Sequence, residues 1–305
     1  DAAPEALRAR ALTARAGLGV VMFAYEEAER DLAAAAELYR RAGDEVGVGG
    51  ALKDMARTAI GRNDYDRAEA LLAEARGPLE RSGDREALGT LYNTLGMLRL
   101  ERNEKAEAAT YFWRALELLE GVGQLRQVAA VRTNLGTALA EIGDPEGARQ
   151  QQQRAADDLE RAGDGWSHAR VLDSLGETLR RLGRDDEARA VLERALAVRR
   201  RIHDWLGAIN SYHFLSLLTM ETEPETAERY LRESIRIVRT TPRPRFIGFI
   251  LQSCGDFAAV RGDAERAIRL WAAAAARFRS MGVATDGPLT DHQARYQDAV
   301  YAAVS

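Results

Sequence analysis

The sequence predicts an all-α solenoid, and the first observation behind this prediction is a repeat of 40 residues that runs seven times along the chain. Two-residue turn signals recur at that interval, at Gly43-Asp44, Gly83-Asp84, Gly123-Gln124, Gly163-Asp164 and His203-Asp204. A unit the size of one helix pair cannot bury its own apolar face, so the copies must stack and share a continuous core.

Each repeat splits into two helical stretches, which is the second observation. Apolar residues lie three and four positions apart on both sides of a short breaker, as in Leu135, Leu139 and Ile142 before Gly143-Asp144-Pro145. Proline at the start of the second helix costs little, because the amide proton that it lacks would have no acceptor within the helix. No stretch alternates apolar and polar residues for long enough to predict a strand. The pattern therefore indicates helix pairs.

Small residues at fixed positions are the third observation. A Leu-Gly step recurs at Leu95-Gly96, Leu135-Gly136 and Leu175-Gly176. Two alanine columns follow, at Ala28, Ala68, Ala108, Ala148 and Ala188, and at Ala35, Ala75, Ala115, Ala155 and Ala195. Larger side chains there would hold the backbones apart, so these residues predict close helix packing.

The expected elements follow in order. Seven helix pairs are predicted over residues 4–43, 44–83, 84–123, 124–163, 164–203, 204–243 and 244–283, with a capping helix in 284–305, all in a single domain over 1–305. The first five pairs keep the alanine columns in register. In the sixth, the alanine comes one residue early, at Ala227, after Pro224. The seventh begins beside Pro242 and Pro244, which disfavour helix. We expect a break or bend in the stacking there, either as a hinge or as ordinary loop variation.

These columns resemble the tetratricopeptide repeat, whose pattern places Gly or Ala in the first helix and two alanines seven residues apart in the second. Gly96 with Ala108 and Ala115 is one instance in this sequence. The ordinary repeat has about 34 residues, so each longer unit here adds roughly 9 Å of helix. The resemblance covers residues 4 to about 283 and implies a right-handed superhelix of about seven helix pairs.

Long units with a Gly-Asp junction are also similar to those of Leu-Gly-Asn-type adaptors and of bacterial STAND regulators (signal-transduction ATPases with numerous domains). All but two of the 43 basic residues are arginine, the exceptions being Lys53 and Lys105, and this bias is typical of a GC-rich bacterial genome. The C-terminal stretch around Arg295-Tyr296 looks like the closing segment of such regulators. The resemblance favours the C-terminal sensor part of a regulator, joined to an ATPase module.

Chemistry beyond binding finds little support in the sequence. There is no Gly-x-x-x-x-Gly-Lys-Ser/Thr loop, and the glycines of 47–50 lack the preceding strand of a phosphate-binding loop, so we expect a flexible or closely packed helix start there. The four histidines lie too far apart for a metal pair on one helix. The single cysteine, Cys254, lies in an apolar helix and has no disulfide partner. We expect no catalysis, no cofactor and no metal.

Charge and hydropathy restrict the partners. The formal net charge is −4, with acidic and basic residues interspersed, so no field across the chain favours nucleic acid. No apolar run reaches the roughly 18 residues of a membrane span, and no signal peptide is evident. We therefore expect a cytoplasmic protein with no direct contact with nucleic acid or a membrane.

The resemblance places the first helix of each pair on a concave groove, and four positions around the Leu-Gly glycine keep one stripe on that face. This stripe predicts the following partner-binding residues: Lys53, Arg57, Thr90, Asn93, Thr133, Arg170, Asp173, Glu177, Arg180, Asn210 and His213.

Two interpretations of the stripe stay open. In one, Arg170 pairs with Asp173 and Glu177 with Arg180, and these ion pairs only keep the wall solvated. In the other, the stripe binds an extended peptide or another domain.

Tryptophans give a second candidate surface. Trp166 and Trp205 begin successive first helices, where they either plug the core between units or form an interaction rim, and Trp271 is expected to fill space left by small neighbours.

These observations predict a non-catalytic scaffold that recognises a protein or peptide, or senses a small-molecule inducer. The preferred setting is the C-terminal part of a bacterial STAND-type regulator of signalling or transcription. The alternative is a free-standing adaptor that binds an extended peptide in its groove.

Overall fold

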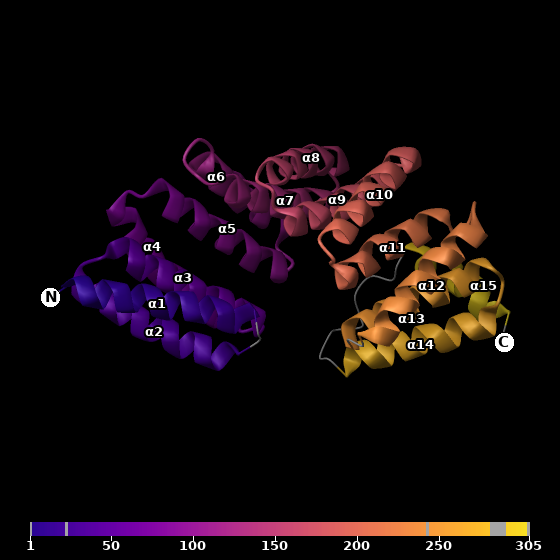
Figure 1. Ribbon diagram of the computed structural model, residues 1–305, viewed down its shortest axis with the longest axis horizontal. Coiled ribbons are helices and arrows are strands. Elements are labelled where there is room, and N and C mark those ends of the chain that lie inside the picture. The colour runs from indigo at the N-terminus through magenta and orange to yellow at the C-terminus, as the bar shows by residue number, and fades with distance from the viewer. Residues whose placement is uncertain (1, 22–23, 242–243, 281–290, 304–305) are drawn as a thin grey trace. The chain divides into compact units, whose positions relative to one another are not determined.

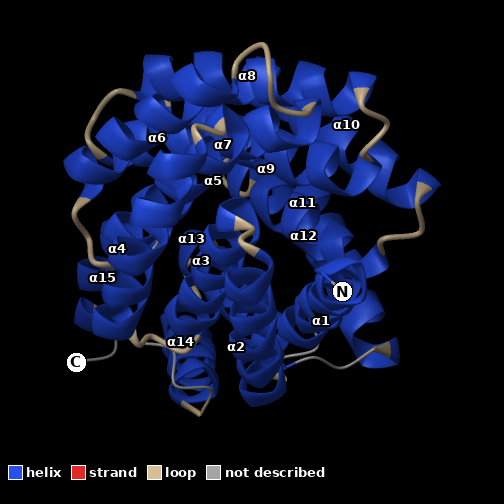
Figure 2. Cartoon of the chain, turned by 90° about the vertical axis from the view of Figure 1, so that its left-hand side faces the viewer, coloured by secondary structure: helices blue, strands red, loops and turns tan. Residues whose placement is uncertain are grey.

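The computed structural model describes residues 2–21, 24–241, 244–280 and 291–303. These residues form fifteen α-helices in repeated pairs and contain no strand, so the predicted all-α class is confirmed (Figures 1 and 2). Contacts divide the chain into two compact units, unit 1 (Asp1–Ala162) and unit 2 (Gly163–Ser305), which we describe separately. The single domain expected over 1–305 stays a prediction.

Unit 1 consists of four helix pairs. They are α1 (Ala2–Val21) with α2 (Tyr25–Ala42), α3 (Glu45–Gly61) with α4 (Tyr65–Ser82), α5 (Arg85–Glu101) with α6 (Lys105–Leu119), and α7 (Leu125–Glu141) with α8 (Pro145–Arg161). Each helix packs on its partner, and the second helix of one pair packs on the first helix of the next. First helices of neighbouring pairs also touch, as α3 with α5 and α5 with α7.

Unit 2 contains three pairs and a last helix. The pairs are α9 (Gly165–Arg181) with α10 (Asp185–Arg201), α11 (Trp205–Thr219) with α12 (Pro224–Thr240), and α13 (Pro244–Val260) with α14 (Ala264–Arg279). First helices again meet, α9 with α11 and α11 with α13. The last helix, α15 (Asp291–Ala302), packs on α13 and α14 as the expected cap does, while residues 284–290 lie outside the described residues.

The two residues of the Gly-Asp junction have different structural roles: the glycine ends one helix and the aspartate caps the next. Gly43 ends α2 in the left-handed conformation with φ 68°, which glycine adopts without strain. Asp44 then caps α3 by accepting the Gly47 amide at 2.8 Å. The left-handed residue and the capping aspartate recur at Gly83-Asp84, Gly163-Asp164 and His203-Asp204. At 123–124 the junction differs, because α6 ends earlier, Gly121 has the positive φ, and Gln124 and Gln127 form a capping box.

The small residues have the packing role that the sequence predicts. A Cβ on Gly96 would lie 2.5 Å from the Phe112 ring, and one on Gly176 would lie 2.5 Å from Leu192. All ten alanines of the two columns are at most 1% exposed. Two of the glycines of 47–50 are closely packed at the start of α3, since a Cβ on Gly47 would meet Tyr39 at 2.3 Å and one on Gly49 would meet Leu79 at 2.3 Å, whereas a Cβ on Gly50 would meet nothing within 4 Å.

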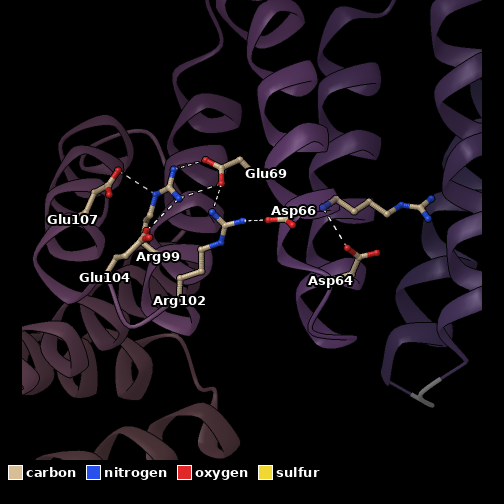
Figure 3. A network of polar contacts seen from close by, with 8 residues as sticks. Asp64, Asp66, Glu69, Arg99, Arg102, Glu104 and Glu107 are labelled. Carbon is tan, nitrogen blue, oxygen red and sulfur yellow. Dashed lines mark hydrogen bonds and ion pairs between the residues drawn. The ribbon is translucent and has the colours of Figure 1, made fainter.

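Ion pairs add a second link between neighbouring pairs of unit 1 (Figure 3). Arg99, near the end of α5, bonds Glu69 of α4 at 2.6 Å and also pairs with Glu104 at 3.2 Å and Glu107 at 3.1 Å. Arg102 shares Glu69 with it. The Arg99 side chain is only 12% exposed, so this network is partly shielded from solvent.

The segment predicted to break the array lies between α12 and α13. α12 ends at Thr240 and α13 begins at Pro244, as the two prolines favour, while Pro242 and Arg243 lie outside the described residues. The expected bend or hinge stays a prediction. Beyond it, Trp271 is buried as expected, and its indole Nε1 donates to Asp256 at 2.9 Å.

Candidate functional site

In unit 1, the predicted stripe is satisfied within the protein. Thr90 and Thr133 donate their hydroxyl protons to backbone carbonyls of their own helices, at 2.9 and 2.7 Å. Asn93 accepts a hydrogen bond at 3.0 Å from Asn134 of the neighbouring first helix. Short side chains with internal partners leave little on this part of the stripe for a ligand.

Two cations of the unit 1 stripe share one acid. Lys53 and Arg57 lie 3.2 and 3.6 Å from the Asp54 carboxylate. Arg57 is exposed, so this cluster is a solvated ion pair of small energetic value.

In unit 2, the stripe opens into a cavity of about 250 Å³ among α9, α11, α12 and α13. Its polar lining comes from Arg170, Asp173, Ser174, Asn210, His213, Ser234 and Ser253. Its apolar lining comes from Ile209, Phe214, Leu231, Phe249 and Ile250. The structure therefore brings four predicted residues, Arg170, Asp173, Asn210 and His213, to one place.

Glu177 and Arg180 do not line this cavity. Arg180 donates to both carboxylate oxygens of Glu177, at 2.8 and 3.0 Å, and Arg181 adds a third bond at 2.9 Å. This pair agrees with the interpretation of the stripe as a set of solvating ion pairs.

Asp173 forms part of the cavity floor, and the expected pair with Arg170 is wrong. Asp173 is 4% exposed and accepts hydrogen bonds from Arg199 at 2.5 Å and from the Ser211 hydroxyl at 2.7 Å. Arg199 is also buried, and its other end bonds Asp204, the cap of α11, at 2.5 Å. Burial raises the pKa of Asp173, while Arg199 and then Ser211 oppose that rise. The carboxylate is fully used by the fold.

Arg170 is left without a countercharge. Among the described residues no carboxylate pairs with it, and its guanidinium carbon lies 5.3 Å from the centre of the Trp166 ring. The pKa of Arg170 is lowered, first by loss of solvation and then by the nearby Arg199, and Asp164 partly opposes this. Arginine stays protonated in proteins, so the edge of the cavity carries a positive charge that has no ion-pair partner among the described residues.

His213 and Ser253 connect α11 to α13 across the cavity. The Ser253 hydroxyl lies 2.9 Å from the Phe249 carbonyl oxygen, to which it can donate, and 2.6 Å from His213 Nδ1, where the imidazole tautomer sets which of the two atoms donates. Phe214 and Phe249 lie beside the imidazole, with ring centres 5.2 and 6.5 Å away. This arrangement fixes the ring of His213.

The sequence analysis missed Ser253 and Ile250 as parts of this site. Ser253 lies 40 residues after His213, and Ile250 lies 40 after Asn210, so extending the stripe into the seventh repeat would have found both. Trp166 and Trp205, for which the sequence left a core plug and an interaction rim as alternatives, are 56% and 47% exposed. The prediction of core plugs is wrong, and the interaction rim is the alternative that remains.

Among the described residues, no group of histidine, cysteine and acidic side chains could hold a metal ion. No helix in the described part of the chain is long and apolar enough to cross a membrane.

Comparison with known proteins identifies the repeats. Two sequence models described as tetratricopeptide repeat match residues 128–162 and 167–240. A search of curated proteins found no match.

Several solved structures share the fold. A STAND protein with a tetratricopeptide repeat sensor from Pyrococcus horikoshii superposes with a TM-score of 0.70 at 19% identity, over 87% of this chain but only 41% of that protein. The apo form of RapI has a TM-score of 0.70 at 10% identity over 90% of this chain and 98% of its own. A Rap protein complexed with Competence and Sporulation Factor has a TM-score of 0.65 at 13% identity, over 90% and 76%.

The matched residues lie in pairs that share their small-residue columns with the other described helix pairs, and the superposed structures have the same architecture. The chain is an array of tetratricopeptide repeats.

Proposed function

We propose that this chain is a non-catalytic recognition module that binds its partner through the first-helix face of unit 2. The observation that carries this proposal is the cavity there, which has an uncompensated arginine at its edge. A charged group without an ion-pair partner contributes little to the fold, so Arg170 is available to pair with an anionic group of a ligand. The other charged members of the stripe are paired or buried within the protein.

The side chains of the cavity support binding rather than catalysis. The Ser253 hydroxyl can donate to the Phe249 carbonyl at 2.9 Å, and this bond competes with its donation to His213 Nδ1 at 2.6 Å. Asp173 is held by Arg199 and Ser211 and has no free role in proton transfer. The chain is therefore proposed to have no enzymatic activity of its own.

The proposed setting is the C-terminal sensor part of a bacterial STAND-type signalling ATPase or transcriptional regulator, in the cytoplasm. The fold shared with the Pyrococcus horikoshii protein supports this, since 87% of this chain superposes on less than half of that protein. The arginine bias is a second support. The proposed partners are a protein or peptide or the linked ATPase module, with a small-molecule inducer as a further ligand, and neither nucleic acid nor a membrane.

The setting can be tested on the gene. A nucleotide-binding module encoded in the same reading frame supports the regulator. A reading frame that encodes only this array favours the free-standing peptide-binding adaptor instead.

The recognition face can be tested with charge reversal. The immobilised chain is exposed to a lysate of the source organism, and bound proteins are quantified for the wild type, Arg170→Glu and Arg269→Glu. Arg269 is an exposed arginine of α14 outside the cavity, so its variant is the matched control. We expect a component that Arg170→Glu loses and Arg269→Glu keeps. Identical binding by all three proteins would reject the first-helix face of unit 2 as the recognition surface.

A further inference from the structure

The cavity of unit 2 has a size and depth that suit a small molecule. Its volume of about 250 Å³ exceeds the roughly 150 Å³ of an engineered cavity that binds benzene. Leu231 and Ser234 of α12, a second helix, help to line it, so the cavity reaches between the two helices of a pair. An extended peptide would instead run along the surface of successive first helices. The dimensions favour one ring-sized apolar group with a short polar extension.

The polar side of the cavity selects a negative charge. Arg170 has no paired carboxylate among the described residues, and the acid that acts on it, Asp164, is already engaged in capping α9 through the Ser167 amide and hydroxyl. Asp173, the other acid beside the cavity, is neutralised by Arg199. An anion at Arg170 would thus meet a cation with no competing internal partner.

A second donor lies in register with Arg170. Asn210 occupies the same position one repeat later, on the adjacent first helix, and its side-chain amide makes no hydrogen bond with the described residues. A guanidinium and an amide on neighbouring helices can each donate to one oxygen of a carboxylate. Both residues line the same cavity, whose apolar lining includes Phe214 and Phe249.

We propose that this cavity binds a small monocarboxylate with an apolar body about the size of a phenyl ring, with the carboxylate held by Arg170 and Asn210. The apolar body lies against Phe214, Phe249 and Ile250, and Trp166 covers the outer side of the Arg170 guanidinium. This inference rests on the proposed recognition function of the same face and names the chemical class of its inducer.

The experiment uses the full chain and two isosteric probes, 3-phenylpropionate and its neutral amide, 3-phenylpropanamide. Binding is measured by titration calorimetry and ligand-observed NMR. We expect the acid to bind with a Kd of about 1 mM or lower, as fits a ligand of this size, and the amide to bind at least about tenfold more weakly, because it carries no charge for Arg170. Arg170→Gln should weaken the acid by at least about tenfold and leave the amide unchanged.

Controls separate binding from folding. Arg170 makes no ion pair with the described residues, so Arg170→Gln is expected to keep its circular dichroism spectrum and melting temperature. Arg269→Gln should bind both probes as the wild type does. Asn210→Ala should weaken the acid without affecting the amide.

Four results would overturn the proposal. Three of them are equal affinity for acid and amide, no binding of the acid at about 10 mM, and an unchanged affinity in Arg170→Gln. Tighter binding of a blocked peptide, acetyl-Ala-Asp-Phe-Ala-amide, would reassign the carboxylate to a peptide and reject the small molecule. None of these results depends on the lysate experiment with Arg170→Glu, so failure of the ligand class and failure of the recognition face are distinguishable.

Discussion

The first-helix faces of the two units have the same register and different chemistry. One column of the stripe reads Gly50, Thr90 and Ala130 in unit 1, and Arg170, Asn210 and Ile250 in unit 2. The residues of unit 1 are small, and the hydroxyls of Thr90 and Thr133 on this face donate to backbone carbonyls of their own helices. Larger residues in unit 2 surround a cavity. The repeat thus conserves packing at some positions and leaves others free to determine binding.

Each unit also buries a carboxylate, in a different way. In unit 1, Asp158 is 3% exposed and pairs with Arg132 and with Arg161, whose side chain is 67% exposed. In unit 2, Asp173 pairs with Arg199, and both are buried. A fully buried pair depends on its partner far more than one that water can reach. Loss of the arginine should therefore destabilise the protein more at the Asp173–Arg199 pair than at the Asp158–Arg132 pair.

The largest expected effect follows from removing the cation of unit 2. Arg199→Met leaves Asp173 buried with only the Ser211 hydroxyl, and we expect a loss of about 3–5 kcal/mol in the free energy of unfolding. Arg132→Met in unit 1 should cost less, because Arg161 still pairs with Asp158. Urea unfolding followed by circular dichroism measures both, and hydrogen exchange should place the loss in α9–α11.

A second variant tests the cause of that loss. In the double variant Arg199→Met with Asp173→Asn, no uncompensated charge is buried, so part of the stability should return. If the double variant is as unstable as Arg199→Met alone, the buried charge is not the reason.

A smaller effect is expected from a methyl group beside the same pair. A Cβ on Gly207 would lie 1.8 Å from Arg199 Nη1 and 2.0 Å from Asp204 Oδ2, and both atoms are held in the ion pair. Gly207→Ala should therefore cost about 1–3 kcal/mol. In unit 1, Gly50 lies within α3 with open space around its Cβ position, so Gly50→Ala should stabilise by about 0.5–1 kcal/mol. Thermal unfolding gives both values, and opposite signs for the two glycines are the decisive result.

The helix pairs could be predicted from the sequence because their signals are local and repeated. Gly43-Asp44 shows both parts of the junction, since the glycine ends one helix and the aspartate caps the next. The alanine columns predict close packing because volume alone decides what fits there. Four members of the candidate site followed from the same register, namely Arg170, Asp173, Asn210 and His213.

The partners of charged side chains could not be predicted in the same way. Spacing along one helix favours Arg170 as the partner of Asp173, but Arg199 of α10 takes this place from 26 residues away. Which arginine reaches the carboxylate depends on helix packing, and Arg199 passes over Gly207 to do so. The sequence could not decide between the two alternatives for Trp166 for a related reason, because the neighbouring pair determines which side of a helix start faces solvent.

A further comparison concerns two arginines, Arg99 with three carboxylate partners and Arg170 with no ion pair among the described residues. Arg99 of unit 1 bonds three carboxylates and is largely shielded, so Arg99→Ala should cost about 1–3 kcal/mol in the free energy of unfolding. Arg170→Ala in unit 2 should cost less than about 1 kcal/mol, since it loses only the contact with Trp166. Chemical denaturation of the two variants measures the difference. Equal losses would mean that Arg170 supports the fold, contrary to its proposed role in binding.

The smallest expected effect on stability concerns Cys254, the residue after Ser253 on α13. Cys254 lies beside Phe257 and Arg266 in a separate hollow between α12 and α14, and burial raises the pKa of its thiol from 9.0 to about 11. Only the thiolate is nucleophilic, so alkylation of the folded protein by iodoacetamide at pH 8 should be about 100-fold slower than in urea.

The sign of the pH dependence follows from the same shift. The folded state holds the thiol proton more tightly than the unfolded state, so the contribution of Cys254 to stability is present below pH 9 and is lost as the pH rises through 11. The alkylation rate of the folded protein should rise about tenfold per pH unit from pH 8 to 10 without reaching a plateau. A plateau near pH 9 would show that the thiol is solvated as in the unfolded chain and that the hollow beside α13 does not bury it.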